Sequence, residues 1–192
     1  MNHAPILKTL LVALFSIGLA GAASAQAAAK AGKISRHDRQ FIENAVRSNM
    51  AEYELGKLAE QHAASPEVKQ FAERMVSDHG KAGEELREVA QQKGITLPDR
   101  PKHAEKREMG KLAKLSGPQF DREYIDHMVK DHRKGVKEFQ EEAQKAKDPE
   151  VKKSAEQMLA TLKEHLQMAE QAQAAMGGGK SRARTEEKSG RQ

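Results

Sequence analysis

The sequence contains no cysteine and no tryptophan, and aromatic residues are only 4% of its 192 positions. Without cysteine the chain has no disulfide, no thiolate metal site and no thiol nucleophile. So few aromatic side chains argue against a stacking platform for nucleic acid. The formal net charge is +5, from 33 basic and 28 acidic residues of interspersed sign. That mixture is typical of a solvated surface, so no nucleic-acid partner is predicted.

The first 25 residues have the pattern of a secretory signal peptide. Lys8 precedes a short apolar run over residues 9–20, and small residues ending in Ala-Ser-Ala at 23–25 follow. A basic start, a short apolar core and an Ala-x-Ala site direct export and are then removed. We expect an exported, periplasmic protein that begins near Gln26. The alternative is a retained membrane anchor, although the apolar run is short for a membrane span.

Four long segments of the remaining chain carry apolar residues at helical spacing. They are residues 36–63, 66–93, 117–146 and 149–175. Ser65-Pro66-Glu67 and Asp148-Pro149-Glu150 are matching helix starts, each an N-cap followed by proline and an acid. The loop before each start is so short that the flanking helices must form a hairpin. The sequence therefore predicts an all-α fold, a four-helix bundle of two antiparallel helical hairpins joined by a long connection.

The same patterns divide the chain into regions. Residues 26–35 are predicted to be a linker of small residues, and residues 36–175 the bundle domain. The connection over residues 94–116 contains two prolines, and a short amphipathic helix is expected within it. Residues 176–192 lack an apolar pattern and are predicted to be a disordered basic tail. Its positive charge makes the tail a candidate for peripheral contact with anionic components of the cell envelope.

Two short strings occur twice. Pro-Glu-Val-Lys at residues 66–69 recurs at residues 149–152, which aligns one hairpin with the other. Met-Val-x-Asp-His at residues 75–79 recurs at residues 128–132, which aligns the second helix with the third. Similar patterning of unrelated bundle helices is one explanation. The shared Met-Val-x-Asp-His string is specific enough that we favour an ancient duplication.

One strong ionisable residue interrupts the apolar seam of each helix. These residues are Glu52, His79, His132 and His165. At 1.5 Å of rise per residue, all four lie near the middle of the bundle. Imidazole and carboxylate are ordinary ligands of zinc, iron, copper and nickel, so the four predict a site for one transition-metal ion. The alternative is a buried hydrogen-bond network that fixes the register of the helices.

Other polar residues near these seams are predicted to have structural roles. Asp78 and Asp131 each precede a seam histidine, and neighbouring helix residues differ by about 100° in direction. Both carboxylates are therefore expected to face away from the seam. Asn49 lies on the same seam as Glu52. Asp121 and Tyr124 at the start of the third long helix are expected to cap and to pack.

These residues stand in strings that resemble a bacterial family called domain of unknown function 4142. The strings are Glu52-Tyr53-Glu54-Leu55-Gly56-Lys57-Leu58-Ala59, Asp78-His79, Gly117-Pro118-Gln119-Phe120-Asp121-Arg122-Glu123-Tyr124, Asp131-His132 and His165-Leu166. The resemblance covers about residues 36–175. It implies a ferritin-like bundle with a long crossover between the hairpins, and no established activity. Family members are often labelled predicted outer membrane proteins, which implies outer-membrane association as an alternative location.

The sequence departs from classical di-iron ferritins. Those proteins carry Glu-x-x-His on two helices, whereas Val76 and Leu162 stand three residues before His79 and His165. A di-iron ferroxidase is therefore not predicted. We find no nucleophile–base arrangement, phosphate loop or glycosidase carboxylate pair, and no enzymatic activity is predicted. The expected function is metal binding in the cell envelope, and the alternative is a structural or interaction bundle whose histidines serve packing alone.

Overall fold

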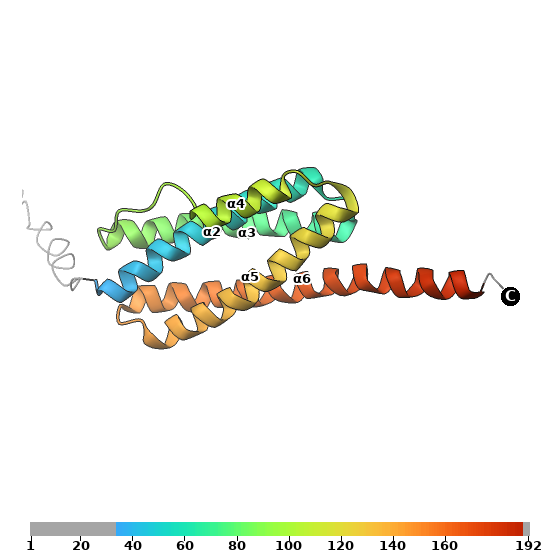
Figure 1. Ribbon diagram of the computed structural model, residues 1–192. Helices are drawn as coiled ribbons and strands as arrows, with labels where there is room; N and C mark the ends of the chain where they lie inside the picture. Colours follow the sequence, from blue (N-terminus) through green and yellow to red (C-terminus); the bar gives the residue numbers. More distant parts are fainter. Residues whose placement is uncertain (1–33, 190–192) are drawn as a thin grey trace, which may run out of the picture. The chain divides into compact units, whose positions relative to one another are not determined.

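The computed structural model describes residues 34–189, with side chains through residue 177. The predicted signal peptide and most of the predicted linker over residues 26–35 lie outside the described residues. Within the described part the chain is helical, with no strand. Its helices are α2 (Arg36–His62), α3 (Pro66–Gln92), α4 (His103–Leu112), α5 (Gly117–Lys145) and α6 (Pro149–Ser189) (Figure 1). The prediction of an all-α bundle is confirmed.

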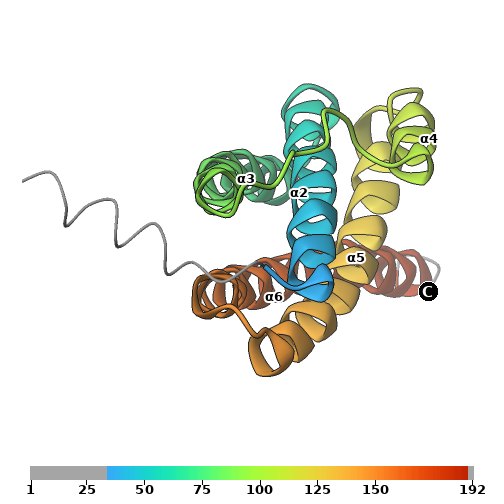
Figure 2. The ribbon, with the colours of Figure 1, turned by 90° about the vertical axis from the view of Figure 1, so that its left-hand side faces the viewer.

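The four long helices form two antiparallel hairpins. Helix α2 packs on α3 and α5 packs on α6, and further contacts between α3 and α6 join the hairpins. The connection that contains α4 runs back along the bundle, so that α3 and α5 are parallel (Figure 1). A single long crossover of this kind is the ferritin-like arrangement. Figure 2 shows α4 outside the bundle, beside α2 and α5, which it contacts.

Local signals in the sequence explain where the helices begin and end. The Ser35 hydroxyl accepts a hydrogen bond from the Asp38 backbone N–H at 3.0 Å, and the Ser65 hydroxyl accepts one from the Val68 N–H at 3.2 Å. These are N-caps, which satisfy backbone donors that the first helical turn leaves free. Gly94 has a φ of 61° just after α3, a left-handed conformation that glycine adopts without steric cost.

The bundle core lies on the predicted seams. Buried apolar side chains form one cluster toward each end of the bundle. Gly56 lies where α2 and α3 come together, because a Cβ there would be 3.0 Å from Val76 Cγ2 and 3.2 Å from Met75 Cβ. A Cβ at Gly135 would be 3.5 Å from Leu162 Cδ1, an ordinary contact. Close packing of helices therefore requires glycine at the first position and not at the second.

Each hairpin caps the turn of the other. The buried Asp121 carboxylate at the start of α5 accepts backbone hydrogen bonds from residues 64 and 65 in the α2–α3 turn, at 3.0 and 2.9 Å. The buried Asp38 carboxylate at the start of α2 accepts from residues 147 and 148 in the α5–α6 turn, at 3.4 and 2.9 Å. The two acceptors are 83 positions apart, and so are the corresponding donors in the two turns. The two Pro-Glu-Val-Lys strings have the same offset. We call Asp38 and Asp121 the reciprocal aspartate caps.

Helix α6 continues further than the sequence predicts. A disordered tail is predicted over residues 176–192, whereas the structure keeps a helical backbone to Ser189. Disorder was predicted only because residues 176–192 lack an apolar face. The lysine, arginine, alanine and glutamate residues that follow the glycines at 177–179 have high intrinsic helix propensity, which needs no apolar face. Residues 190–192 lie outside the described part of the chain.

None of the helices in residues 34–189 combines the length and the apolar character needed to cross a membrane.

Candidate metal centre

The structure brings together the four seam residues. His79 from α3, His132 from α5 and His165 from α6 are 4%, 0% and 0% exposed, and their ring centroids are 5.3–6.3 Å apart. One nitrogen from each ring lies within 4.8 Å of the others. Glu52 from α2 completes the group, with its Oε2 atom 2.9 Å from His79 Nε2 and 3.9 Å from His132 Nε2.

Two of the histidines use one ring nitrogen to donate a hydrogen bond outward. His132 Nδ1 lies 2.9 Å from the carbonyl oxygen of Met128 in the preceding turn of α5. His165 Nε2 lies 2.9 Å from Asp78 Oδ2 on α3. A carbonyl or a carboxylate oxygen can only accept, so in each case the ring nitrogen carries the proton.

His79 is held by Asn49 in the same way. The Asn49 Nδ2 group donates to the His79 backbone carbonyl at 2.9 Å, which turns its Oδ1 atom toward His79 Nδ1, also at 2.9 Å. The amide orientation is thus fixed by two contacts at once, and His79 Nδ1 is the donor.

The remaining nitrogens point at one another. His79 Nε2, His132 Nε2 and His165 Nδ1 are fully buried and have no hydrogen-bond partner. A neutral imidazole that donates from one nitrogen has a free lone pair on the other. Histidines that ligate metals have this arrangement, with the outer nitrogen bonded to a carboxylate or carbonyl oxygen. Metal–nitrogen bonds of about 2.1 Å place tetrahedral ligand atoms about 3.4 Å apart, so the rings need only a small inward shift.

The charges at the centre also favour a cation. Burial alone would raise the pKa of Glu52, but the interactions with His132 and His79 outweigh burial and hold that pKa at about 2. Glu52 is therefore ionised. Burial, with the neighbouring histidines, lowers the pKa of His165 to about 4 against the opposing effect of Asp78. A carboxylate oxygen that faces the lone pair of His79 Nε2 at 2.9 Å needs a proton or a metal ion between the two atoms.

Asp78 does not face away from the cluster, and that prediction is wrong. Its carboxylate contacts His165 from behind and also accepts a hydrogen bond from Arg74. Asp78 is rotated by about 100° from the seam of α3, and its side chain reaches α6, the other helix that packs on α3. Asp131 faces away from the cluster, as predicted. Its side chain is 38% exposed, and its Oδ2 atom lies 3.5 Å from His127 Nε2.

The two residues at the start of α5 have the expected structural roles. Asp121 caps the α2–α3 turn. Tyr124 is fully buried against Phe71 and Phe120, with ring centroids 6.1 and 5.4 Å away. Phe71 also meets His132 and His165 edge-on, at 6.3 and 6.2 Å. One side of the histidine cluster is therefore apolar.

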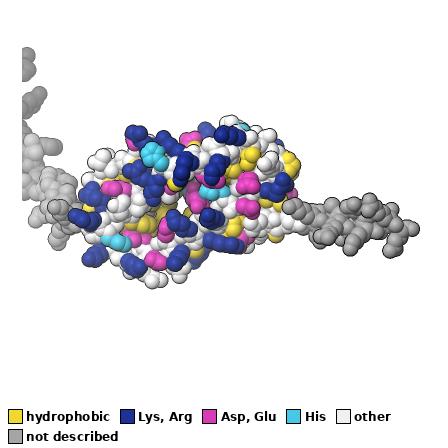
Figure 3. Space-filling model, in the orientation of Figure 1, with side chains coloured by type: hydrophobic (Ala, Val, Ile, Leu, Met, Phe, Trp, Pro, Cys, Tyr) yellow, Lys and Arg dark blue, Asp and Glu magenta, His cyan; other side chains and the backbone are white. Residues whose placement is uncertain are grey.

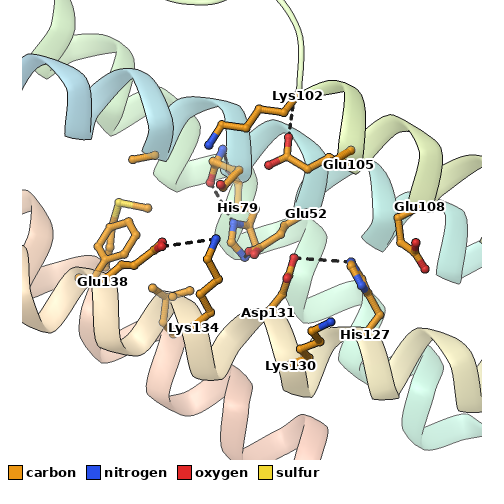
Figure 4. Close-up of a pocket in the computed structure, with 18 of the residues that line it drawn as sticks. Glu52, His79, Lys102, Glu105, Glu108, His127, Lys130, Asp131, Lys134 and Glu138 are labelled. Atoms are coloured by element: carbon orange, nitrogen blue, oxygen red, sulfur yellow. Dashed lines mark hydrogen bonds and ion pairs between the residues drawn. The ribbon is translucent and has the colours of Figure 1, made fainter.

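The opposite side opens to a cavity of about 630 Å³ between α2, α4 and α5, to which Glu52 and His79 contribute. Figure 4 shows these two side chains deep in the cavity and charged side chains from α4 and α5 around its mouth. Basic and acidic groups alternate over the same face of the molecule (Figure 3). Among the residues at the mouth are Glu105, Glu108, Lys130, Asp131, Lys134 and Glu138. The cavity offers an ion a route from solvent to the buried ligands.

The sequence matches one family model over most of its length. The family described as domain of unknown function (DUF4142) matches residues 23–172. The chain belongs to the DUF4142 family. No curated protein sequence matches this DUF4142 chain.

Solved structures share its fold. A DUF305 fragment from Deinococcus radiodurans superposes with a TM-score of 0.65 at 16% identity, over 75% of this chain and 97% of that one. A DUF305 protein from Streptomyces coelicolor gives a TM-score of 0.63 at 18% identity, over 73% and 92%. CopM in its Cu(I)-bound form gives a TM-score of 0.59 at 21% identity, over 70% and 93%. At these identities the likeness establishes the bundle fold.

Proposed function

We propose that this DUF4142 chain is an exported envelope protein that binds one transition-metal ion through His79, His132, His165 and Glu52. The observation that carries the proposal is the convergence of three buried ring nitrogens without hydrogen-bond partners beside one ionised carboxylate. Three neutral nitrogens and one carboxylate oxygen suit a four-coordinate divalent ion. Asn49, Met128 and Asp78 hold the rings in the ligating tautomer.

Copper is the first ion to test. An imidazole-rich site binds divalent copper most tightly of the common first-row ions. CopM, which shares the bundle fold, has been solved with Cu(I), with Cu(II) and with silver bound. That likeness supports the order of testing, while the ligand set proposed here comes from the residues of this chain.

A purely structural histidine cluster is the competing function. Such a network would stabilise the bundle by pairing its own polar atoms, since a buried unpaired nitrogen costs about 1–3 kcal/mol. Here His132 Nε2 and His165 Nδ1 have no hydrogen-bond partner, and His79 Nε2 faces only the Glu52 carboxylate at 2.9 Å. This arrangement argues against a purely structural role for the histidine cluster.

The test is a titration of metal-free protein with copper, zinc, nickel, iron and manganese, followed by calorimetry and thermal melting. We expect saturable binding of copper at the cluster, and a stabilisation of about 2.7 kcal/mol at a hundredfold excess over the dissociation constant. A chelator should reverse it. His132→Leu should abolish this response, and so should Glu52→Gln, which preserves the shape of the side chain. His103→Leu, at an exposed histidine outside the cluster, is the matched control and should behave as wild type. No saturable binding by any of these ions would overturn the proposal.

Export is tested separately. Protein recovered from the native envelope should begin near Gln26, and N-terminal sequencing that finds Met1 would contradict export.

A further inference from the structure

A second group of ligand-type side chains lies at the end of the bundle where α2 begins and α5 ends. His37 Nδ1 is 3.3 Å from Asp38 Oδ1, and His37 Nε2 is 3.4 Å from Glu142 Oε2. One ligand atom from each of the three residues lies within 4.8 Å of the others. Asp38 and Glu142 are buried, while the His37 side chain is 55% exposed. The group therefore combines two buried carboxylates with one histidine that solvent can reach.

Capping explains Asp38 but not its two neighbours. At the other end of the bundle Asp121 caps the equivalent turn in the same way. The positions 83 residues from His37 and Glu142 are occupied there by Phe120 and Ala59, both buried and apolar. A reciprocal aspartate cap thus works without a histidine or a second carboxylate beside it.

Glu142 is the unexplained member of the group. It is 4% exposed, and its Oε1 atom is buried without a hydrogen-bond partner. Among the described residues, His37 is the only basic side chain in ion-pair contact with it, because the nearby Lys145 pairs with the exposed Glu141. A buried carboxylate oxygen without a hydrogen-bond partner, close to a second buried carboxylate, is a favourable environment for a bound cation.

We propose that His37, Asp38 and Glu142 form a second divalent-cation site. It is distinct from the mid-bundle centre, the metal site proposed at Glu52 and the three seam histidines. One imidazole and two carboxylates suit zinc or manganese better than copper, because oxygen ligands favour harder ions. Water completes the coordination from a cavity of about 580 Å³ that His37 and Glu142 line. This cavity and the one that reaches Glu52 share Ser48 and Lys134 in their walls, so both sites open on one groove along α2 and α5.

The two sites are separable by zinc titration of the metal-free full chain, with bound zinc counted by elemental analysis and calorimetry. We expect about two equivalents in the wild type and about one in Glu142→Gln. Glu141→Gln is the matched control at the neighbouring exposed glutamate and should retain both equivalents. His37→Ala changes an exposed side chain, so it should fold normally and lose the same equivalent as Glu142→Gln.

His132→Leu distinguishes this proposal from the mid-bundle centre. That variant should lose the mid-bundle equivalent and keep the second site, and the double variant His132→Leu with Glu142→Gln should bind no zinc. If Glu142→Gln and His37→Ala bind as much zinc as the wild type, the second site is refuted whatever happens at the mid-bundle centre. A wild type that binds a single equivalent, lost entirely in His132→Leu, would refute it as well.

Discussion

The contact between Asp78 and His165 leads to a quantitative prediction about metal affinity. The Asp78 carboxylate lies 2.9 Å from His165 Nε2 and is itself held by Arg74. Its negative charge makes the ring more basic and fixes the orientation in which Nδ1 faces the cluster. Asp78→Asn keeps the size of the side chain and one acceptor oxygen but removes the charge. Asp78→Leu removes the acceptor as well, so that His165 Nε2 has no partner.

The expected losses follow from how much each variant retains. Removing partners that bond the outer nitrogen of a ligating histidine typically weakens metal binding 10- to 100-fold, which equals about 1.4–2.7 kcal/mol. Asp78→Asn keeps an acceptor, so we expect a loss of about tenfold. Asp78→Leu keeps neither charge nor acceptor, so we expect a loss nearer to 100-fold. Both variants retain all four proposed ligands and should still bind one ion at the mid-bundle centre.

The assay is competition for copper against a chelator of known affinity. Asp131→Asn is the matched control, because Asp131 occupies the same place in the second Met-Val-x-Asp-His string but contacts His127 instead of the cluster. Its affinity should stay within about twofold of wild type, as expected for an exposed charge. Wild-type affinity in Asp78→Asn and Asp78→Leu, or an equal loss in Asp131→Asn, would refute the reasoning.

Three further predictions concern the bundle. Gly56→Ala should lower the free energy of unfolding by about 1–2 kcal/mol through overpacking, whereas Gly135→Ala, where a Cβ fits, should raise it by about 0.5–1 kcal/mol; thermal melts that rank them the other way would contradict the packing argument. Asp121→Ala removes two charge-assisted hydrogen bonds and should cost about 2–4 kcal/mol in urea unfolding, so a cost below about 1 kcal/mol would rule out a stabilising cap. Burial would raise the pKa of Asp38, but backbone donors and neighbouring side chains hold it below its ordinary value. The stability that this carboxylate contributes is therefore present above the ordinary pKa near 4 and is lost as the pH falls through the folded pKa. Asp38→Asn should flatten the loss of stability as the pH falls below about 4, and an unchanged acid slope in denaturant melts would count against it.

Much of the fold could be predicted because its signals are local. The caps and prolines at Ser65 and Asp148 mark helix starts within a residue or two, and the hairpin follows from the short loop before each. The mid-bundle cluster was also predictable, since a regular helix fixes both the height and the face of Glu52, His79 and the other seam residues. The height and the face of a residue depend only on the geometry of its own helix.

What could not be predicted depends on which helices are neighbours. Asp78 contacts His165 because α3 packs on α6 as well as on α2. The apolar pattern of α3 predicts one buried face and does not indicate that a second helix covers a neighbouring face. The group at His37 and Glu142 joins the start of one helix to the end of another. A signal for it did exist, because Glu142 stands three residues after Phe139, where the buried seam of α5 continues.

The reciprocal aspartate caps make the two hairpins incomplete without each other. Each hairpin carries, at its own beginning, the acceptor that the other needs at its turn. A hairpin on its own would leave those N–H groups to water and its apolar seam uncovered. The covalent link through residues 94–116 adds Ile95 and Leu112 to the core but supplies neither cap acceptor. A chain cut in that link should therefore reassemble from its halves as a heterodimer.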